Sequence, residues 1–185
     1  MLAQSTQEIE PFRVILKNEV GSTNDIAREA GEPFVVVVAD SQTKGRGRLQ
    51  RAWFSPKGVN VYITANVPLP DGFPQVGLLS STVALSVRMA ILDILPELTE
   101  RLYVKWPNDV YLDMKKLSGI LIEKLKNGLY AVGIGINVNM SEEDLPPELR
   151  KKACSLRTAT GKTFQRDQII KRVLQRVLYY REILL

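Results

Sequence analysis

The sequence predicts an α+β fold in which a mixed β-sheet is backed by helices packed on one of its faces. Apolar runs of strand length recur along the chain, and the run over 34–39 is rich in valine. Two further segments, 74–95 and 166–184, repeat apolar residues at helical spacing, so each presents one apolar side. The order strands, loop, helix, strands, helix is typical of such a domain.

The first elements follow from short apolar runs and from capping residues. A strand is expected at 12–16, followed by a helix that begins at Ser22-Thr23-Asn24-Asp25, because these side chains can cap free helix amides. This helix should end before Gly31. The uninterrupted apolar run at 34–39 predicts a central strand. Residues 40–58 contain glycines and arginines but few apolar positions, which indicates a long functional loop.

The second half adds four more strands around a hairpin. Strand character returns at 59–67, and another strand is expected at 102–106 before a turn at Lys115-Lys116. The segments 117–126 and 129–138 are joined by Asn127-Gly128, which is a strong two-residue hairpin signal.

Composition excludes several classes of chemistry. The 185 residues fit one domain spanning 1–185, and no apolar run is long enough for a membrane span. The chain has no histidine, so neither a Ser-His-Asp mechanism nor a usual zinc site can form within it. The single cysteine, Cys154, allows no internal disulfide, and no secretory signal starts the chain, so we expect a cytoplasmic protein.

The loop Gln42-Thr43-Lys44-Gly45-Arg46-Gly47-Arg48 is the sharpest local signal. Glycines allow backbone amides to approach an anion, and arginine offers a charged planar fork that suits phosphate or carboxylate. A solvated basic loop explains the same residues equally well. The spacing of a P-loop is absent.

Four weaker signals each carry two interpretations. Lys105, before Trp106-Pro107-Asn108-Asp109, could neutralise a phosphate, although a surface lysine beside a turn is favoured for this stretch alone. Glycines within 117–138 mark either a ligand's approach or a tight helix–sheet contact. Ser22-Thr23-Asn24 could bind a ligand, but ordinary capping is favoured. Trp53 could stack on a purine or anchor the loop.

In combination, these motifs resemble the biotin protein ligase family, over about Glu19 to Asn139. The resemblance implies the fold shared with lipoate ligases and a two-step reaction. Biotin and ATP first form biotinyl-5′-AMP, and biotin then passes to a lysine of a biotin carboxyl carrier protein or domain. The motifs that carry the resemblance are Ser22-Thr23-Asn24, Gln42–Arg48, Trp53-Phe54-Ser55-Pro56-Lys57-Gly58, Lys105–Asp109, Lys116-Leu117-Ser118-Gly119-Ile120-Leu121 and Gly133-Ile134-Gly135-Ile136-Asn137.

The resemblance also implies site residues. Lys105, Arg46 and Arg48 would be the catalytic cations, and Mg²⁺ would enter with ATP rather than bind a protein-only metal site. Biotin would contact Ser22, Thr23, Asn24, Gln42, Gly45, Arg46, Gly47, Arg48, Lys105 and Gly119. The adenylate would contact Arg46, Arg48, Trp53, Lys105, Asn108 and Asn137.

The chain departs from the family pattern at several points. Gln50 replaces a usual loop glycine, no DNA-binding helix-turn-helix is expected before Phe12, and the common C-terminal β-barrel is not evident. We therefore expect no repressor activity, no nucleic-acid partner and no membrane partner. The sequence leaves the oligomeric state open, and a homodimer is one candidate. The alternative functions are a lipoate or octanoate ligase of the same fold and a non-catalytic biotin-binding module.

Overall fold

One mixed sheet forms the centre of the computed structural model, which describes residues 9–70 and 76–184. Seven strands within these residues are ordered β1-β2-β3-β7-β6-β5-β4. β1 and β2 run parallel, and the other neighbouring pairs run antiparallel. The strands are β1 (Arg13–Val20), β2 (Val35–Gln42), β3 (Val61–Pro68), β4 (Leu102–Lys105), β5 (Asp109–Leu112), β6 (Lys115–Lys124) and β7 (Leu129–Ile136). The predicted mixed sheet is confirmed.

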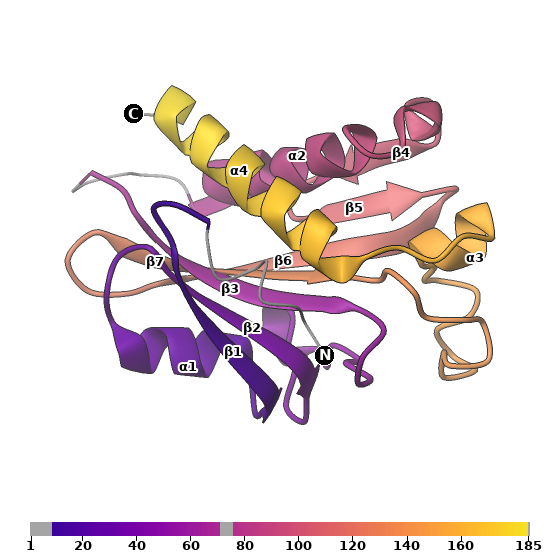
Figure 1. Cartoon of the computed structure of the whole chain (residues 1–185), viewed down its shortest axis with the longest axis horizontal. Helices are drawn as coiled ribbons and strands as arrows, with labels where there is room; N and C mark the ends of the chain where they lie inside the picture. Colours follow the sequence, from indigo (N-terminus) through magenta and orange to yellow (C-terminus); the bar gives the residue numbers. More distant parts are fainter. Residues whose placement is uncertain (1–8, 71–75, 185) are drawn as a thin grey trace.

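The helices lie on both faces of the sheet, as Figure 1 shows. α2 (Val76–Leu92) and α4 (Arg166–Leu184) pack together on one face, while α1 (Thr23–Ala30) covers β2, β3 and β7 on the other. The prediction that all helices share one face is therefore wrong for α1. The remaining helical pieces are short: η2 (Arg48–Gln50), η3 (Pro96–Leu98) and α3 (Leu156–Thr160).

Strand β2 shows why its sequence reads as an uninterrupted apolar run. Val36 and Val38 belong to the large core beneath α2 and α4, whereas Val35 and Val37 pack with Ala27 beneath α1. Because successive side chains of a strand point to opposite faces, a strand covered on both faces has no polar positions to alternate.

The two turns of the C-terminal strands give one confirmed prediction and one correction. Asn127 and Gly128 have φ values of 55° and 68°, which matches the expected tight hairpin between β6 and β7. The preceding turn falls at Asp113 and Met114, which have φ values of 49° and 64°. Lys115 and Lys116 therefore belong to β6, and the turn predicted at these lysines is wrong by two residues.

An irregularity in β6 decides which of its side chains share a face. Ser118 pairs with Val110 but Lys116 pairs with Tyr111, so Leu117 is an extra residue in the ladder. Leu117 is buried in the large core, and Lys116 and Gly119 both line the cavity described below. Strict alternation would place these two residues on opposite faces.

Other boundaries differ slightly from expectation. β2 extends to Gln42, so the predicted loop 40–58 begins within a strand, and Pro74 of the predicted helix 74–95 lies outside the described residues. In the described part of the chain, no helix combines the length and apolarity that crossing a membrane requires.

The single cysteine, Cys154, is buried, and this burial raises the pKa of its thiol to about 12.

Candidate active site

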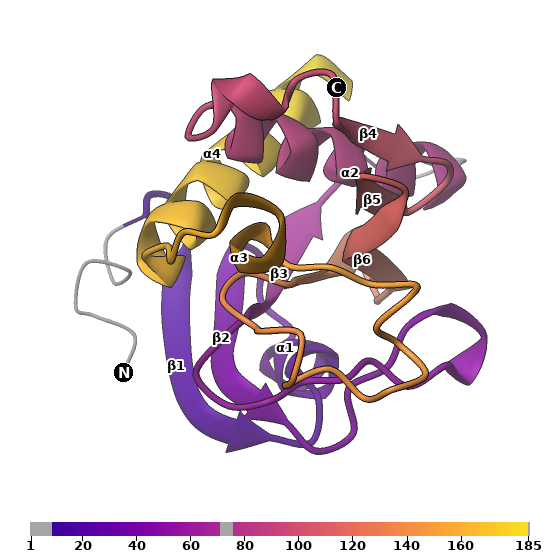
Figure 2. The same ribbon diagram turned by 90° about the vertical axis from the view of Figure 1, so that its right-hand side faces the viewer.

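A cavity of about 590 Å³ opens on the face of the sheet that carries α1. Its floor includes three glycines of β6 and β7: Gly119, Gly133 and Gly135. Its walls come from the start of α1, the loop after β2, the start of β5 and the connection 140–153. Figure 2 shows this connection, in orange, on the side of the sheet that carries α1.

Most of the predicted site residues line this cavity. They are Ser22, Thr23, Asn24, Gln42, Arg46, Gly47, Arg48, Trp53, Asn108, Gly119 and Asn137. Gly45 and Lys105 are not among the lining residues. Gly45 instead lets the loop pack on itself, because a Cβ there would lie 2.6 Å from the carbonyl oxygen of Trp53.

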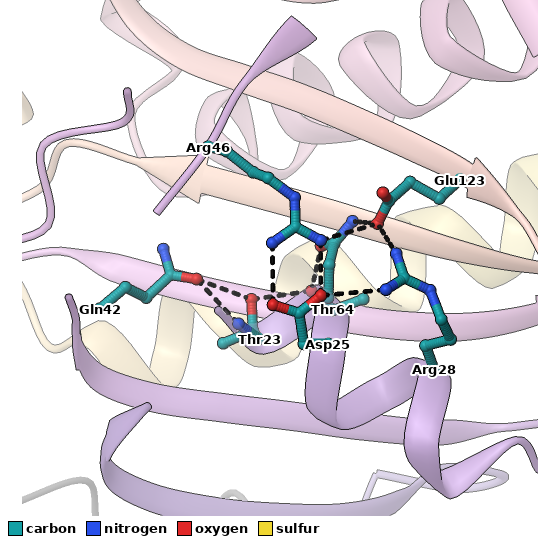
Figure 3. Close-up of polar contacts among 8 residues, drawn as sticks. Thr23, Asp25, Arg28, Gln42, Arg46, Thr64 and Glu123 are labelled. Atoms are coloured by element: carbon teal, nitrogen blue, oxygen red, sulfur yellow. Dashed lines mark hydrogen bonds and ion pairs between the residues drawn. The ribbon is translucent and has the colours of Figure 1, made fainter. Parts of the chain in front are cut away.

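Buried polar side chains form a hydrogen-bonded cluster at the start of α1. The amide oxygen of Gln42 accepts hydrogen bonds from the backbone N–H of Thr23 at 2.9 Å and from its hydroxyl at 3.1 Å. The Thr64 hydroxyl lies 2.8 Å from the Thr23 hydroxyl and 2.7 Å from the amide oxygen of Asn24. Because an amide proton donates to it, the oxygen end of Gln42 is fixed, and its nitrogen donates to Ser55 at 3.1 Å. Figure 3 shows Thr23, Gln42 and Thr64 of this cluster.

Ser22 is the N-cap residue by position but makes no side-chain capping bond. Gln42 supplies the hydrogen bond to the first helical amide instead. Capping, the interpretation favoured for Ser22 on sequence alone, therefore does not account for its buried hydroxyl, which lines the cavity.

Arg46 is engaged with carboxylates of the protein. Its guanidinium donates two hydrogen bonds to Asp25, at 2.9 and 2.6 Å, and lies 3.5 Å from Glu123. The hydrogen bond from Arg46 lowers the pKa of Asp25, and the same contact raises the pKa of Arg46. Arg28, which is also in α1, lies 3.0 Å from Asp25 and 2.9 Å from Glu123.

Arg48 is exposed and differs from Arg46 in its partners. It donates to the Asn108 amide oxygen at 3.1 Å, and Asn108 is itself held by a 2.9 Å bond to the Ile120 carbonyl. The next residues, Leu49 and Gln50, have φ values of 56° and 57°. Gln50 thus adopts the left-handed conformation that a glycine would reach with less strain.

Trp53 lies on the glycine floor. A Cβ at Gly135 would be 2.6 Å from its indole nitrogen, and a Cβ at Gly119 would be 3.0 Å from its ring. Its indole N–H is buried without a protein partner, so it is a donor that a bound molecule could satisfy. Gly133 instead accommodates Asn24 of α1. Gly133 therefore makes the tight helix–sheet contact that the sequence offered as one alternative, whereas the approach of a ligand to these glycines stays a prediction.

The structure places Lys116, rather than Lys105, in the cavity wall. The Lys116 ammonium is 2.8 Å from Asp109 and 5.4 Å from the centre of the Trp53 ring. Lys105 does not line the cavity itself, but its ammonium packs over the ring of the lining residue Tyr111 at 4.4 Å. The expected role of Lys105 therefore stays a prediction.

Sequence reasoning missed several other lining residues. The connection 140–153 contributes Met140, Leu145, Leu149, Lys152 and Ala153. The apolar spacing of Leu145 and Leu149, on either side of Pro146-Pro147, was the available signal. Asn137 lines the cavity as predicted, and its amide donates to the Cys154 carbonyl at 3.0 Å, so it also holds this connection against β7.

The family assignment rests on a sequence match that covers most of the site. Residues 18–140 match the profile of the biotin/lipoate A/B protein ligase family. The chain belongs to this family. The bifunctional ligase/repressor BirA of Bacillus subtilis is 34% identical over 173 residues, which are 88% of this chain and 50% of that protein. The chain thus spans about half the length of such relatives.

Solved structures of biotin protein ligases share the fold. A biotin protein ligase from Aquifex aeolicus in complex with biotin and ATP is 38% identical with a TM-score of 0.81, over 91% of this chain and 70% of that one. A biotin protein ligase from Leishmania major in complex with biotinyl-5-AMP is 28% identical with a TM-score of 0.80, over 94% and 76%. The family resemblance inferred from the motifs is confirmed.

Proposed function

We propose that this chain is an ATP-dependent biotin–protein ligase that forms biotinyl-5′-AMP and transfers biotin to a lysine of a carrier protein. One observation supports this most directly. A single cavity joins a neutral, hydrogen-bonding end at Thr23, Asn24 and Gln42 to a cationic end at Lys116 and Arg48. The two ends of biotin match the two ends of the cavity, since biotin has a neutral ring amide at one end and a carboxylate at the other.

The neutral end favours biotin over lipoate. Ser22, Thr23 and Gln42 offer a buried hydroxyl and amide groups that suit a cyclic urea. The dithiolane ring of lipoate has no groups of comparable hydrogen-bonding strength, so it would leave the hydrogen-bonding capacity of this end unused.

The cationic end suits the first chemical step. The biotin carboxylate attacks the α-phosphorus of ATP, forms the acyl-phosphate bond and releases pyrophosphate. The carboxylate is ionised at neutral pH, so this step needs no general base. The obstacle is the approach of two anions, which Lys116 and Arg48 relieve by placing positive charge at the reacting oxygens. We assign Lys116 the role that the sequence assigned to Lys105, because Lys116 reaches the cavity.

The magnesium that accompanies ATP fits a site with one acidic residue. Asp109 is the single carboxylate among the lining residues, and Asn108 lies next to it. Mg²⁺ in nucleotide sites is commonly held by one or two carboxylates and by the phosphates. No cluster of three or more metal-binding side chains of His, Cys, Asp or Glu exists in the described residues.

The second step requires an uncharged lysine amine of the carrier. That amine attacks the acyl carbon of biotinyl-5′-AMP, forms an amide, releases AMP and loses one proton. The mixed anhydride must be kept from water until the carrier arrives. Leu145 and Leu149 give the connection 140–153 an apolar surface over the cavity, which suits a cover for the nucleotide base and the intermediate.

Two alternatives are separated by one experiment. Pyrophosphate release would be measured with biotin, lipoate or octanoate, with and without a biotin carboxyl carrier domain. Of the three acids, only biotin is expected to support pyrophosphate release, and the biotin label is expected on the carrier lysine. Release with lipoate or octanoate would favour the corresponding ligase, and biotin binding without release would favour a non-catalytic module. The absence of binding for all three acids would reject the proposal.

The cellular setting is part of the same proposal. The free, buried Cys154 is compatible with a reducing compartment, so we place the protein in the cytoplasm with a carrier protein as its partner. We propose neither a nucleic-acid nor a membrane partner, and a homodimer remains a candidate assembly.

A further inference from the structure

Arg46 belongs to a four-residue charge cluster that joins three elements of the site. We call Arg46, Asp25, Arg28 and Glu123 the arginine clamp, and Figure 3 shows it. Arg46 comes from the loop after β2, Asp25 and Arg28 from α1, and Glu123 from β6. Two arginines face two carboxylates, so the formal charges of the clamp cancel.

This geometry is unfavourable for binding a substrate anion at Arg46. The guanidinium side chain is 20% exposed and makes a bidentate contact with Asp25, and Glu123 closes its other side. A phosphate or carboxylate that approached Arg46 would therefore meet two negative charges of the protein. Arg48, two residues later, makes no ion pair within the described residues and is exposed.

The clamp is connected directly to the ligand-facing polar cluster. Asn24 donates to Glu123 at 2.7 Å, and the Asn24 amide oxygen contacts Thr64 at 2.7 Å. Thr64 in turn lies 2.8 Å from Thr23, which bonds to Gln42 at the start of the loop. Fixing Arg46 thus fixes the near end of the loop against the same residues that face the cavity.

We propose that Arg46 is a positioning residue whose clamp holds the first part of the loop, through residue 46, in place before any ligand binds. The tip that follows, with Arg48, lies outside the clamp and is not held by it. This assignment replaces an anion-binding role for Arg46, and its consequence for activity rests on the proposed biotin ligase function. The loop conformation itself does not depend on that function.

Trypsin can test the proposal on the ligand-free protein, because Lys44, Arg46, Arg48 and Arg51 provide cleavage sites on both sides of the boundary. Mass spectrometry would locate the first cuts. Cleavage after Arg48 and Arg51 is expected to precede cleavage after Lys44 and Arg46. In Asp25→Asn and Glu123→Gln, cleavage after Lys44 and Arg46 should become about five- to tenfold faster as local opening increases.

Asp93→Asn is the matched control for this experiment. Asp93 and Arg176 also form a bidentate pair of similar exposure, with side chains 23% and 29% exposed, but they join the residue after α2 to α4 on the opposite face. Its loop cleavage should equal that of the wild type. Unchanged cleavage after Lys44 and Arg46 in both clamp variants would overturn the proposal.

A second measurement separates positioning from anion binding. Asp25→Asn should raise the KM for biotin about fivefold with a smaller change in kcat, because the loop must then be ordered at the expense of binding. The exchanged pair Asp25→Arg with Arg46→Asp should recover much of this loss. An anion-binding Arg46 predicts the reverse: no loss in Asp25→Asn and no recovery in the exchanged pair. If the wild type shows no biotin-dependent activity while the cleavage result holds, the proposed function fails and the clamp stands.

Discussion

The indole of Trp53 lies directly on the backbone of Gly135, and a Cβ at that glycine would stand 2.6 Å from two atoms of the ring. No side chain fits between them unless the indole moves. The contact links the loop after β2 to the floor of the cavity, so the position of this loop depends on the absence of a side chain in β7.

Gly135→Ala should therefore displace Trp53 and weaken biotin binding. Overpacking of this kind destabilises the local packing by about 1–3 kcal/mol. Returning the indole to its place when biotin binds would draw on that energy, which corresponds to a loss of affinity of about 5- to 150-fold. Calorimetric titration measures the affinity, and tryptophan emission reports the displacement, since the other tryptophan, Trp106, is already 77% exposed. Gly77→Ala is the control, because a Cβ there meets nothing within 4 Å. Equal affinity in the two variants would contradict this reading of the contact.

Lys116→Ala should lower the rate of biotinyl-5′-AMP formation far more than Lys105→Ala. Removing a positioned charge-stabilising group costs about 10²–10³ in kcat, and Lys116 is the lysine of the two that lines the cavity. Single-turnover pyrophosphate release measures the step directly. A larger loss for Lys105→Ala would return the catalytic role to the lysine expected from the sequence.

Asp40→Asn should destabilise the fold more than a substitution that breaks an exposed ion pair. Asp40 and Arg166 form a 2.8 Å pair in which the side chains are only 11% and 10% exposed. Breaking a buried pair leaves an uncompensated charge and costs about 3–5 kcal/mol. Urea unfolding gives the free energy of unfolding. Glu32→Gln, which breaks an exposed pair with Arg13, should change it by less than about 1 kcal/mol.

Acid should weaken the fold below about pH 4. Hydrogen bonds from arginines lower the pKa values of Asp25, Asp93 and Asp113 in the folded protein. Their contribution is fully present above the unfolded pKa of about 3.9 and disappears as the pH falls through the lower folded values. Thermal midpoints should be level from pH 5 to 7 and should fall towards pH 3. The triple variant with asparagine at all three positions should flatten that decline, and an identical decline in the variant would refute the cause.

The sequence predicted the regular elements well where local signals determine them. Asn127-Gly128 set the hairpin, and the valine run set β2, because turn geometry and burial on both faces are written in adjacent residues. The side of the sheet on which α1 packs was not predictable in this way. It depends on which faces of β2, β3 and β7 remain uncovered by α2 and α4.

The site was predicted as a set of motifs, but not as a set of roles. Lys116 was missed because the extra residue Leu117 changes the alternation of β6, and no sequence period reveals such an irregularity. Arg46 and Arg48 look alike in sequence, yet only Arg46 meets carboxylates, which lie 21 and 77 positions away along the chain at Asp25 and Glu123. Long-range charge pairing of this kind requires the fold.

Alternate residues of strand β7 serve two different purposes, packing in the core and close contacts at the cavity. Val132, Ile134 and Ile136 face the large core, while Gly133 and Gly135 face α1 and the cavity. In a library of single variants scored separately for expression and for biotinylation, neighbouring positions of this strand would be depleted in different screens. Changes at the first three would be lost from the pool of folded protein, whereas changes at the two glycines would displace Trp53 or Asn24 and lower biotinylation by the molecules that still fold. In natural sequences, both groups of positions would simply vary little. Only the alternation of the strand shows that the core-facing residues and the glycines are restricted for different reasons.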